Sequence, residues 1–90
     1  MSNASVELAI DRYREQIDAI DKEIVALLNK RAIQSLSIRA LKSCKQIELY
    51  DSGREEEIFE HLAKRNKGPY TDENLRAIYE LILKLNKELP

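Results

Sequence analysis

The first half of this chain carries a stripe of apolar residues with the spacing of one long packing helix. Alternate steps of four and three residues from Val6 to Leu41 visit eleven positions, nine of them apolar. These positions are Val6, Ile10, Tyr13, Ile17, Ile20, Ile24, Leu27, Arg31, Gln34, Ile38 and Leu41. We call them the seam. A heptad repeat of this length predicts a helix that buries one edge against partner helices.

Two polar residues, Arg31 and Gln34, interrupt the seam. A guanidinium removed from water costs several kcal/mol unless it meets an anion or hydrogen-bond acceptors. One interpretation is a buried arginine paired with a glutamate of another helix, or a polar pair that sets the register. The other is that the seam opens here into a pocket for an anionic small molecule. The stripe by itself leaves both interpretations open.

The length of the first helix constrains the assembly. No Pro or Gly occurs before Gly53, so we expect one helix from about Val6 to Cys44. At 1.5 Å per residue it would be roughly 55 Å long, whereas a compact chain of 90 residues has a diameter of only about 30 Å. The chain cannot cover this seam alone. We therefore expect an obligate, intertwined homodimer.

Two shorter helices follow, which makes the predicted fold all-α with three helices. Ser52 and Glu55, with Asp51 just upstream, have the spacing of a capping box, and Gly68-Pro69 is expected to end the second helix. Its apolar face comprises Ile58, Phe59, Leu62 and Ala63. Thr71 is the expected cap of the third helix. The stripe of that helix reads Leu75, Tyr79, Ile82, Asn86 and Leu89, widened by Ile78 and Leu85.

Composition narrows the classes of function. The net charge of −1 gives no basic field for nucleic acid, and no apolar run reaches the ~18 residues of a membrane span. The single Cys44 favours a reducing, cytoplasmic setting. The lone His61 has no cluster of partners that predicts a metal site, and we expect no cofactor. Residues 1–4 resemble the remnant of an expression tag, so we expect the domain to occupy residues 5–90.

The candidate chemistry lies in a set of cations. No serine, cysteine or paired-carboxylate constellation for acid–base or nucleophilic catalysis is visible. Arg31 and Lys42 are eleven residues apart, so they lie within roughly 20° of one helix face and about 16 Å apart along the axis. Arg14 is about 25 Å from Arg31 on the same helix. An antiparallel partner helix that crosses near residue 22 would place its own Arg14 opposite Arg31.

Several segments together resemble the all-helical chorismate mutases. Residues 13–21 read YREQIDAID, similar to the family's L-R-x-x-I-D-x-I-D, and residues 27–31 read LLNKR, similar to L-L-x-x-R. Lys42 stands at the family's lysine position, and residues 51–55, DSGRE, resemble D-P-x-R-E with Ser in place of Pro. Residues 66–69 and 78–82 resemble the second loop and the third helix. The resemblance extends over about residues 6–90 and implies an intertwined dimer of three-helix chains.

The resemblance also implies a reaction and its residues. The reaction is the rearrangement of chorismate, a dicarboxylate, to prephenate, which requires no cofactor. Arg14 would reach into the partner's site, while Arg31 and Arg54 would bind carboxylates. Lys42 would contact the ether oxygen and a carboxylate. Asp51 and Glu55 are expected at the ring hydroxyl, and Asn86 stands where the family has a small polar residue.

One departure from the family pattern is at the end of the chain. The family places a glutamine that donates to the ether oxygen one helical turn after the position of Asn86, and this chain has Pro90 there. Loss of such a donor costs about 10²–10³ in rate. The departure predicts a weakened mutase or, as an alternative, a non-catalytic regulatory or dimerisation domain with the same fold. A further alternative is an isochorismate-pyruvate lyase of this fold, although residues 51–55 favour the mutase. The sequence leaves open whether the domain belongs to a larger bifunctional protein.

Overall fold

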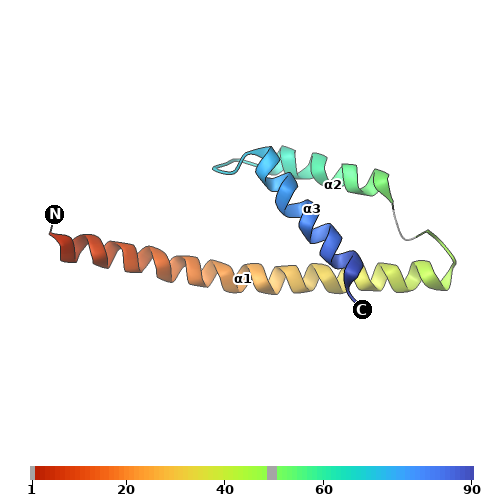
Figure 1. Cartoon of the computed structure of the whole chain (residues 1–90), viewed down its shortest axis with the longest axis horizontal. Helices are drawn as coiled ribbons and strands as arrows, with labels where there is room; N and C mark the ends of the chain where they lie inside the picture. Colours follow the sequence, from red (N-terminus) through yellow and green to blue (C-terminus); the bar gives the residue numbers. More distant parts are fainter. Residues whose placement is uncertain (1, 49–50) are drawn as a thin grey trace. The chain divides into compact units, whose positions relative to one another are not determined.

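The computed structural model of the chain describes residues 2–48 and 51–90, and these residues form three α-helices. The helices are α1, Asn3–Cys44, α2, Ser52–Arg65, and α3, Asp72–Glu88 (Figure 1). The described residues contain no strand. The prediction of an all-α chain with one very long first helix is confirmed.

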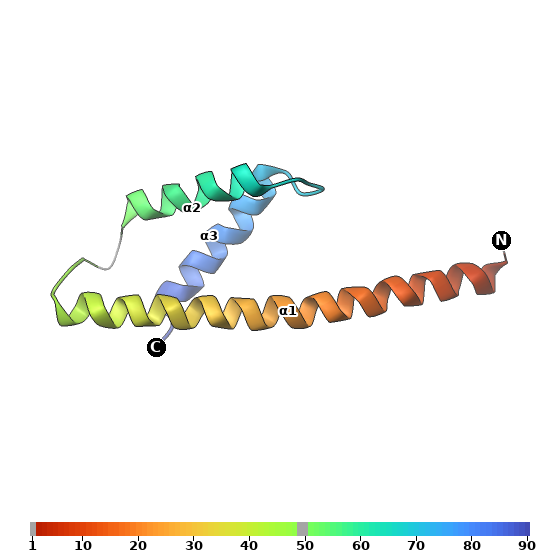
Figure 2. The same cartoon turned by 180° about the vertical axis from the view of Figure 1, so that it is seen from behind.

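The chain divides into two units, and the division falls within α1. The first unit ends at Gln34 and is a single stretch of α1. The second unit begins at Ser35 and contains the end of α1 together with α2 and α3. Within it, α2 and α3 pack against one another (Figure 2 gives the reverse view). No described residue of either unit is fully buried. The chain therefore lacks a closed core of its own among these residues.

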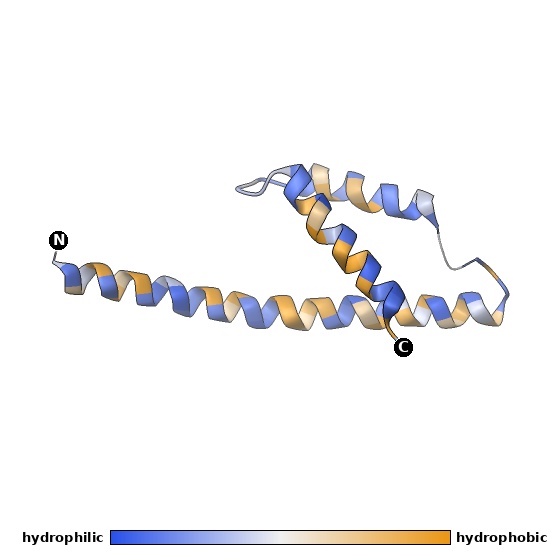
Figure 3. Cartoon of the chain, viewed as in Figure 1, coloured by the Kyte–Doolittle hydropathy of each residue, from blue (hydrophilic) through white to orange (hydrophobic). Residues whose placement is uncertain are grey.

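The seam is uncovered in the first unit. Its seven apolar members there are between 41% and 68% exposed, and Figure 3 shows such hydrophobic residues recurring along α1. They are Val6, Ile10, Tyr13, Ile17, Ile20, Ile24 and Leu27. Ile38 and Leu41, the seam residues of the second unit, are exposed as well. Apolar stripes of this length normally meet another helix.

The start of α1 lies three residues before the predicted Val6. The hydroxyl of Ser2 accepts a hydrogen bond from the Ser5 amide at 3.2 Å, and the Ser2 carbonyl accepts from the Val6 amide. A serine in this place satisfies amides that have no partner within the helix. The predicted end at Cys44 is confirmed. The Ile47 amide there donates to the Lys42 carbonyl at 2.8 Å, after Gln46 in the left-handed region.

The cap of α2 differs from the predicted one by a single residue. Asp51 is the N-cap, and its Oδ1 accepts from the Arg54 amide at 3.0 Å, whereas Ser52 is already helical. The prediction of a Ser52–Glu55 capping box is therefore wrong. An aspartate and a serine in adjacent positions are both good caps, and the aspartate adds a favourable charge at the N-terminal end of the helix.

The turn between α2 and α3 is organised by Asn66 rather than by Gly68-Pro69. The helix already ends at Arg65. Asn66 then uses its side-chain amide to bind the Tyr70 carbonyl and the Asp72 carboxylate, each at 2.8 Å, and its Oδ1 accepts from the Gly68 amide at 3.0 Å. Gly68 adopts φ 75°, which only glycine tolerates readily. The prediction that Gly68-Pro69 ends the second helix is therefore wrong: α2 ends at Arg65, three residues before Gly68, and Gly68 belongs to the turn that follows.

Thr71 caps α3 as predicted. Its Oγ1 accepts from the Asn74 amide at 3.0 Å, and Oδ1 of Asn74 accepts from the Thr71 amide at 3.2 Å. The predicted stripe of α3, from Leu75 to Leu89, is half-buried at every one of its five positions. Among the described residues, no helix combines the length and apolarity that crossing a membrane requires.

Candidate functional site

Arg14 lies on the first unit and projects into solvent. Its side chain is 74% exposed, and its Nη1 is 3.9 Å from the Asp11 carboxylate one turn away. A surface pair at this distance contributes little to stability. The guanidinium is therefore available to a group outside this stretch of helix.

Arg31 and Lys42 are both half-buried, in contrast to the exposed seam residues around them. Arg31 has an interaction within the chain. Lys42 belongs to a half-buried face of α1 in the second unit, which also includes Ser35, Leu36 and Arg39. The end of α1 thus has two distinct faces. One contains Lys42 and is partly covered by the chain itself, and the other contains Ile38 and Leu41 and stays open.

The residues predicted at the start of α2 occupy its first turn. Asp51 uses one carboxylate oxygen for the cap described above. Arg54 extends along the helix surface to Glu57 at 3.4 Å, with 59% of its side chain exposed. Glu55 points towards α3, where its Oε2 lies 2.8 Å from the Lys87 ammonium, and only 24% of its side chain is exposed.

Asn86 lies in the last turn of α3, half-buried and engaged in an interaction within the chain. Its neighbour Lys87 connects this turn to Glu55 of α2. The second unit therefore contains Lys42, Asp51, Arg54, Glu55 and Asn86, while Arg14 and Arg31 belong to the first. The described residues include no group of three or more His, Cys, Asp or Glu side chains that could hold a metal ion.

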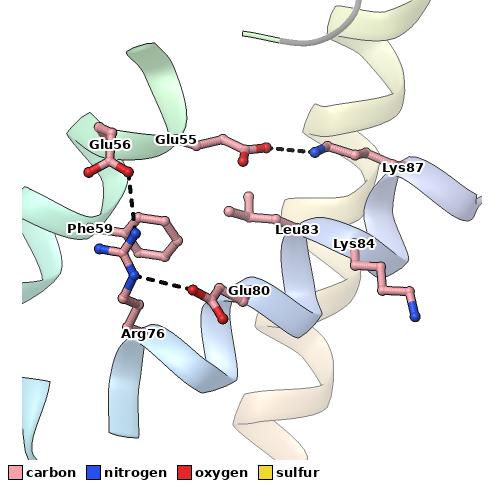
Figure 4. Close-up of a pocket in the computed structure, with 8 residues that line it drawn as sticks. All are labelled: Glu55, Glu56, Phe59, Arg76, Glu80, Leu83, Lys84 and Lys87. Atoms are coloured by element: carbon pink, nitrogen blue, oxygen red, sulfur yellow. Dashed lines mark hydrogen bonds and ion pairs between the residues drawn. The ribbon is translucent and has the colours of Figure 1, made fainter. Parts of the chain in front are cut away.

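A cavity of about 260 Å³ between α2 and α3 was not predicted from the sequence. Figure 4 shows the Arg76 guanidinium over the Phe59 ring, 4.1 Å from its centroid, with Glu56 and Glu80 at 3.3 and 3.2 Å. The residues that line the cavity are Glu55, Glu56, Phe59, Arg76, Glu80, Leu83, Lys84 and Lys87. The charges of three acidic and three basic side chains in this lining cancel. Glu55 is the one residue of the lining that belongs to the predicted site. This cavity lacks the excess positive charge that a dicarboxylate needs.

A family model and two curated relatives that match the chain are all described as chorismate mutases. The family model described as chorismate mutase type II matches residues 13–89. A bifunctional chorismate mutase/prephenate dehydratase from Aquifex aeolicus is 39% identical over an alignment of 78 residues, and the match covers 82% of this chain and 22% of that protein. The enzyme of the same description from Neisseria gonorrhoeae is 35% identical over 83 residues, 92% of this chain and again 22% of the relative. The chain thus spans about a fifth of the length of these curated relatives.

Solved structures agree over nearly the whole chain. A chorismate mutase from Thermus thermophilus, form II, superposes with a TM-score of 0.87 at 32% identity, and the match covers 90% of this chain and 92% of that one. Form I of the same enzyme gives a TM-score of 0.84 at 32% identity, with coverage of 87% and 98%. The three-helix fold of this chain is therefore that of these solved chorismate mutases.

Proposed function

The chain belongs to the chorismate mutase type II family, and from this premise we propose that it rearranges chorismate to prephenate. The family predicted from the sequence is confirmed by the match over residues 13–89. The observation that carries the proposal is that this match includes all seven residues predicted for the site. They are Arg14, Arg31, Lys42, Asp51, Arg54, Glu55 and Asn86.

The proposed chemistry needs no acid, base or nucleophile. One bond breaks and another forms within the substrate, so the protein has to hold the dianion in its reactive conformation and stabilise negative charge that grows on the ether oxygen. We assign the carboxylates to Arg31 and Arg54 and the ether oxygen to Lys42. Asp51 and Glu55 accept from the ring hydroxyl, and Asn86 contributes a polar group from α3.

We also propose that the working unit is a homodimer with shared sites. The uncovered seam of α1 supports this, because seven half-exposed apolar residues in the first unit have no cover from their own chain. The high exposure of Arg14 supports it too. A symmetric partner whose α1 crosses near residue 22 would bring its Arg14 to Arg31. Each site would then contain Arg14 from one protomer and the remaining six proposed site residues from the other protomer.

The second candidate is a non-catalytic domain of the same fold, and the end of α3 favours it. The helix stops at Glu88, with Leu89 as an extended C-cap, so Pro90 lies outside the helix. Residue 90 offers no side-chain donor, and a proline keeps the preceding residue from helical geometry. An ether-oxygen contact from this position is therefore missing, which weakens the mutase proposal at one specific point.

Two smaller proposals accompany the main one. We propose that residues 5–90 form the mutase domain, a range that contains the whole of the family match. We also propose a cytoplasmic location, because the sole cysteine, Cys44, is exposed and carries a free thiol that a reducing compartment would preserve.

An assay of prephenate formation by the purified chain tests the function. We expect activity in the wild type and a loss of about 10²–10³ or more in Lys42→Ala, since one charged contact to the ether oxygen disappears. Lys45→Ala is the matched control, because it removes an exposed lysine just beyond the end of α1 and should leave the rate unchanged. Pyruvate released from isochorismate would identify the lyase instead. No turnover of either substrate by a folded dimer would favour the non-catalytic domain.

A further inference from the structure

The last turn of α3 is held from two sides at Lys87. On one side, the Lys87 ammonium pairs with the Glu55 carboxylate of α2 at 2.8 Å. On the other side, the Lys87 carbonyl accepts a hydrogen bond from Nη1 of Arg39, on α1, at 3.3 Å. One residue therefore joins all three helices of the second unit, and it directly follows Asn86.

Arg39 makes a second bond to the same end of α3. Its Nη2 donates to the Pro90 carbonyl at 3.2 Å, so both arms of the guanidinium are used. The Lys87 carbonyl is one of the final carbonyls of α3, which have no partners within the helix and carry partial negative charge, whereas Pro90 lies just beyond the helix. An arginine fork is a suitable ligand for two such main-chain oxygens. Arg39 acts here as a C-terminal cap supplied by another helix, 48 residues away from Lys87 in sequence.

The position of Arg39 on α1 connects this cap to the proposed site. Arg39 and Lys42 lie on the same half-buried face of α1. They are three residues apart, about 60° around the helix and roughly 4.5 Å along it. A bond from Arg39 to the turn that contains Asn86 therefore links that turn to the face of α1 that contains Lys42.

We propose that Arg39 is a positioning residue that sets the distance between Lys42 on α1 and Asn86 on α3. This inference builds on the proposed function and adds a residue that the family resemblance does not assign. No described residue of the single chain is fully buried, so within one protomer no closed core immobilises the end of α3. Helix ends without such support fray. Arg39 and the Glu55–Lys87 pair together supply the restraint.

The test compares Arg39→Met and Arg39→Lys with the wild type. Methionine keeps the helix propensity and the apolar stem but has no donors, whereas lysine keeps the charge and can reach one carbonyl. Arg65→Met is the matched control, because it removes an exposed guanidinium from the last turn of α2. We expect kcat to fall about tenfold in Arg39→Met, with KM changed less than about twofold, because misplacement by about 1 Å penalises the transition state most. Arg39→Lys should recover part of kcat.

A second readout does not depend on activity. Amide hydrogen exchange in the last turn of α3 should become about tenfold faster in Arg39→Met and stay unchanged in Arg65→Met. An inactive wild type would reject the proposed function, and the exchange rates would still decide the role of Arg39. Wild-type kcat in a folded Arg39→Met dimer, or unchanged exchange at the end of α3, would overturn the inference.

Discussion

Replacing Ile24 with lysine places a charge in the seam close to the expected crossing point of the two α1 helices. Ile24 is 46% exposed in the single chain. Full burial of an isoleucine side chain contributes roughly 1.5–3 kcal/mol, so a partner that covers the remaining half adds about 1 kcal/mol per copy. Because a lysine stem can keep its ammonium at the edge of the contact, its partial removal from water costs about as much again rather than the full cost of burial. Because a symmetric dimer contains the substitution twice, the dimer should lose about 2–4 kcal/mol.

At 1.4 kcal/mol for each factor of ten, this loss raises the dissociation constant by about thirtyfold to several hundredfold. Sedimentation equilibrium across a concentration series measures that shift, and circular dichroism reports whether helix content falls as the dimer dissociates. Ala26→Lys is the matched control, since residue 26 lies about 200° around the helix from Ile24. A wild-type chain that sediments as a folded, helical monomer at micromolar concentration would refute the dimer. An Ile24→Lys dimer of unchanged affinity would refute the role of the seam.

Two further predictions concern the end of α3 and the start of α2. Pro90→Gln, with a few helix-forming residues added after it, should raise kcat by about tenfold or more, because α3 can then continue and present an amide to the ether oxygen; an unchanged kcat would mean that α3 does not reach the site. Asp51→Ala should lower stability by about 1 kcal/mol through loss of the α2 cap, whereas Ser52→Ala should change it little. Equal losses of melting temperature in these two variants would contradict the assignment of the cap.

The helices could be predicted from the sequence because their signals are local. A heptad stripe without Pro or Gly defines α1. The five periodic residues of α3 from Leu75 to Leu89 are half-buried in the structure. Ile78 and Leu85, predicted to widen this stripe, are exposed, and Leu83 is half-buried instead. Local signals are ambiguous where two neighbouring residues are equally suited to the same structural role. Asp51 and Ser52 are both good N-caps, and the choice of Asp51 became visible only in the geometry of its bond to the Arg54 amide.

The candidate site is less accessible to sequence reasoning because it depends on distances between helices. Lys42 and Glu55 could be singled out by their resemblance to family motifs. Arg39 could not, because its bonds reach main-chain oxygens 48 and 51 residues away. Every residue has such an oxygen, so no residue type in the sequence marks which one will accept. The Arg76–Phe59 contact in the cavity was missed for a similar reason, because it joins α3 to α2.

Mixed dimers of Arg14→Ala and Arg31→Ala chains test the central claim most directly. Each variant alone should be inactive, because both of its sites lack one cation. In a refolded equimolar mixture, about half of the dimers contain one chain of each kind, and each of these has one intact site. The account predicts recovery of about a quarter of the wild-type activity. An active wild type whose mixture stays inactive, although mass spectrometry shows the mixed dimers, would contradict a site built from two chains.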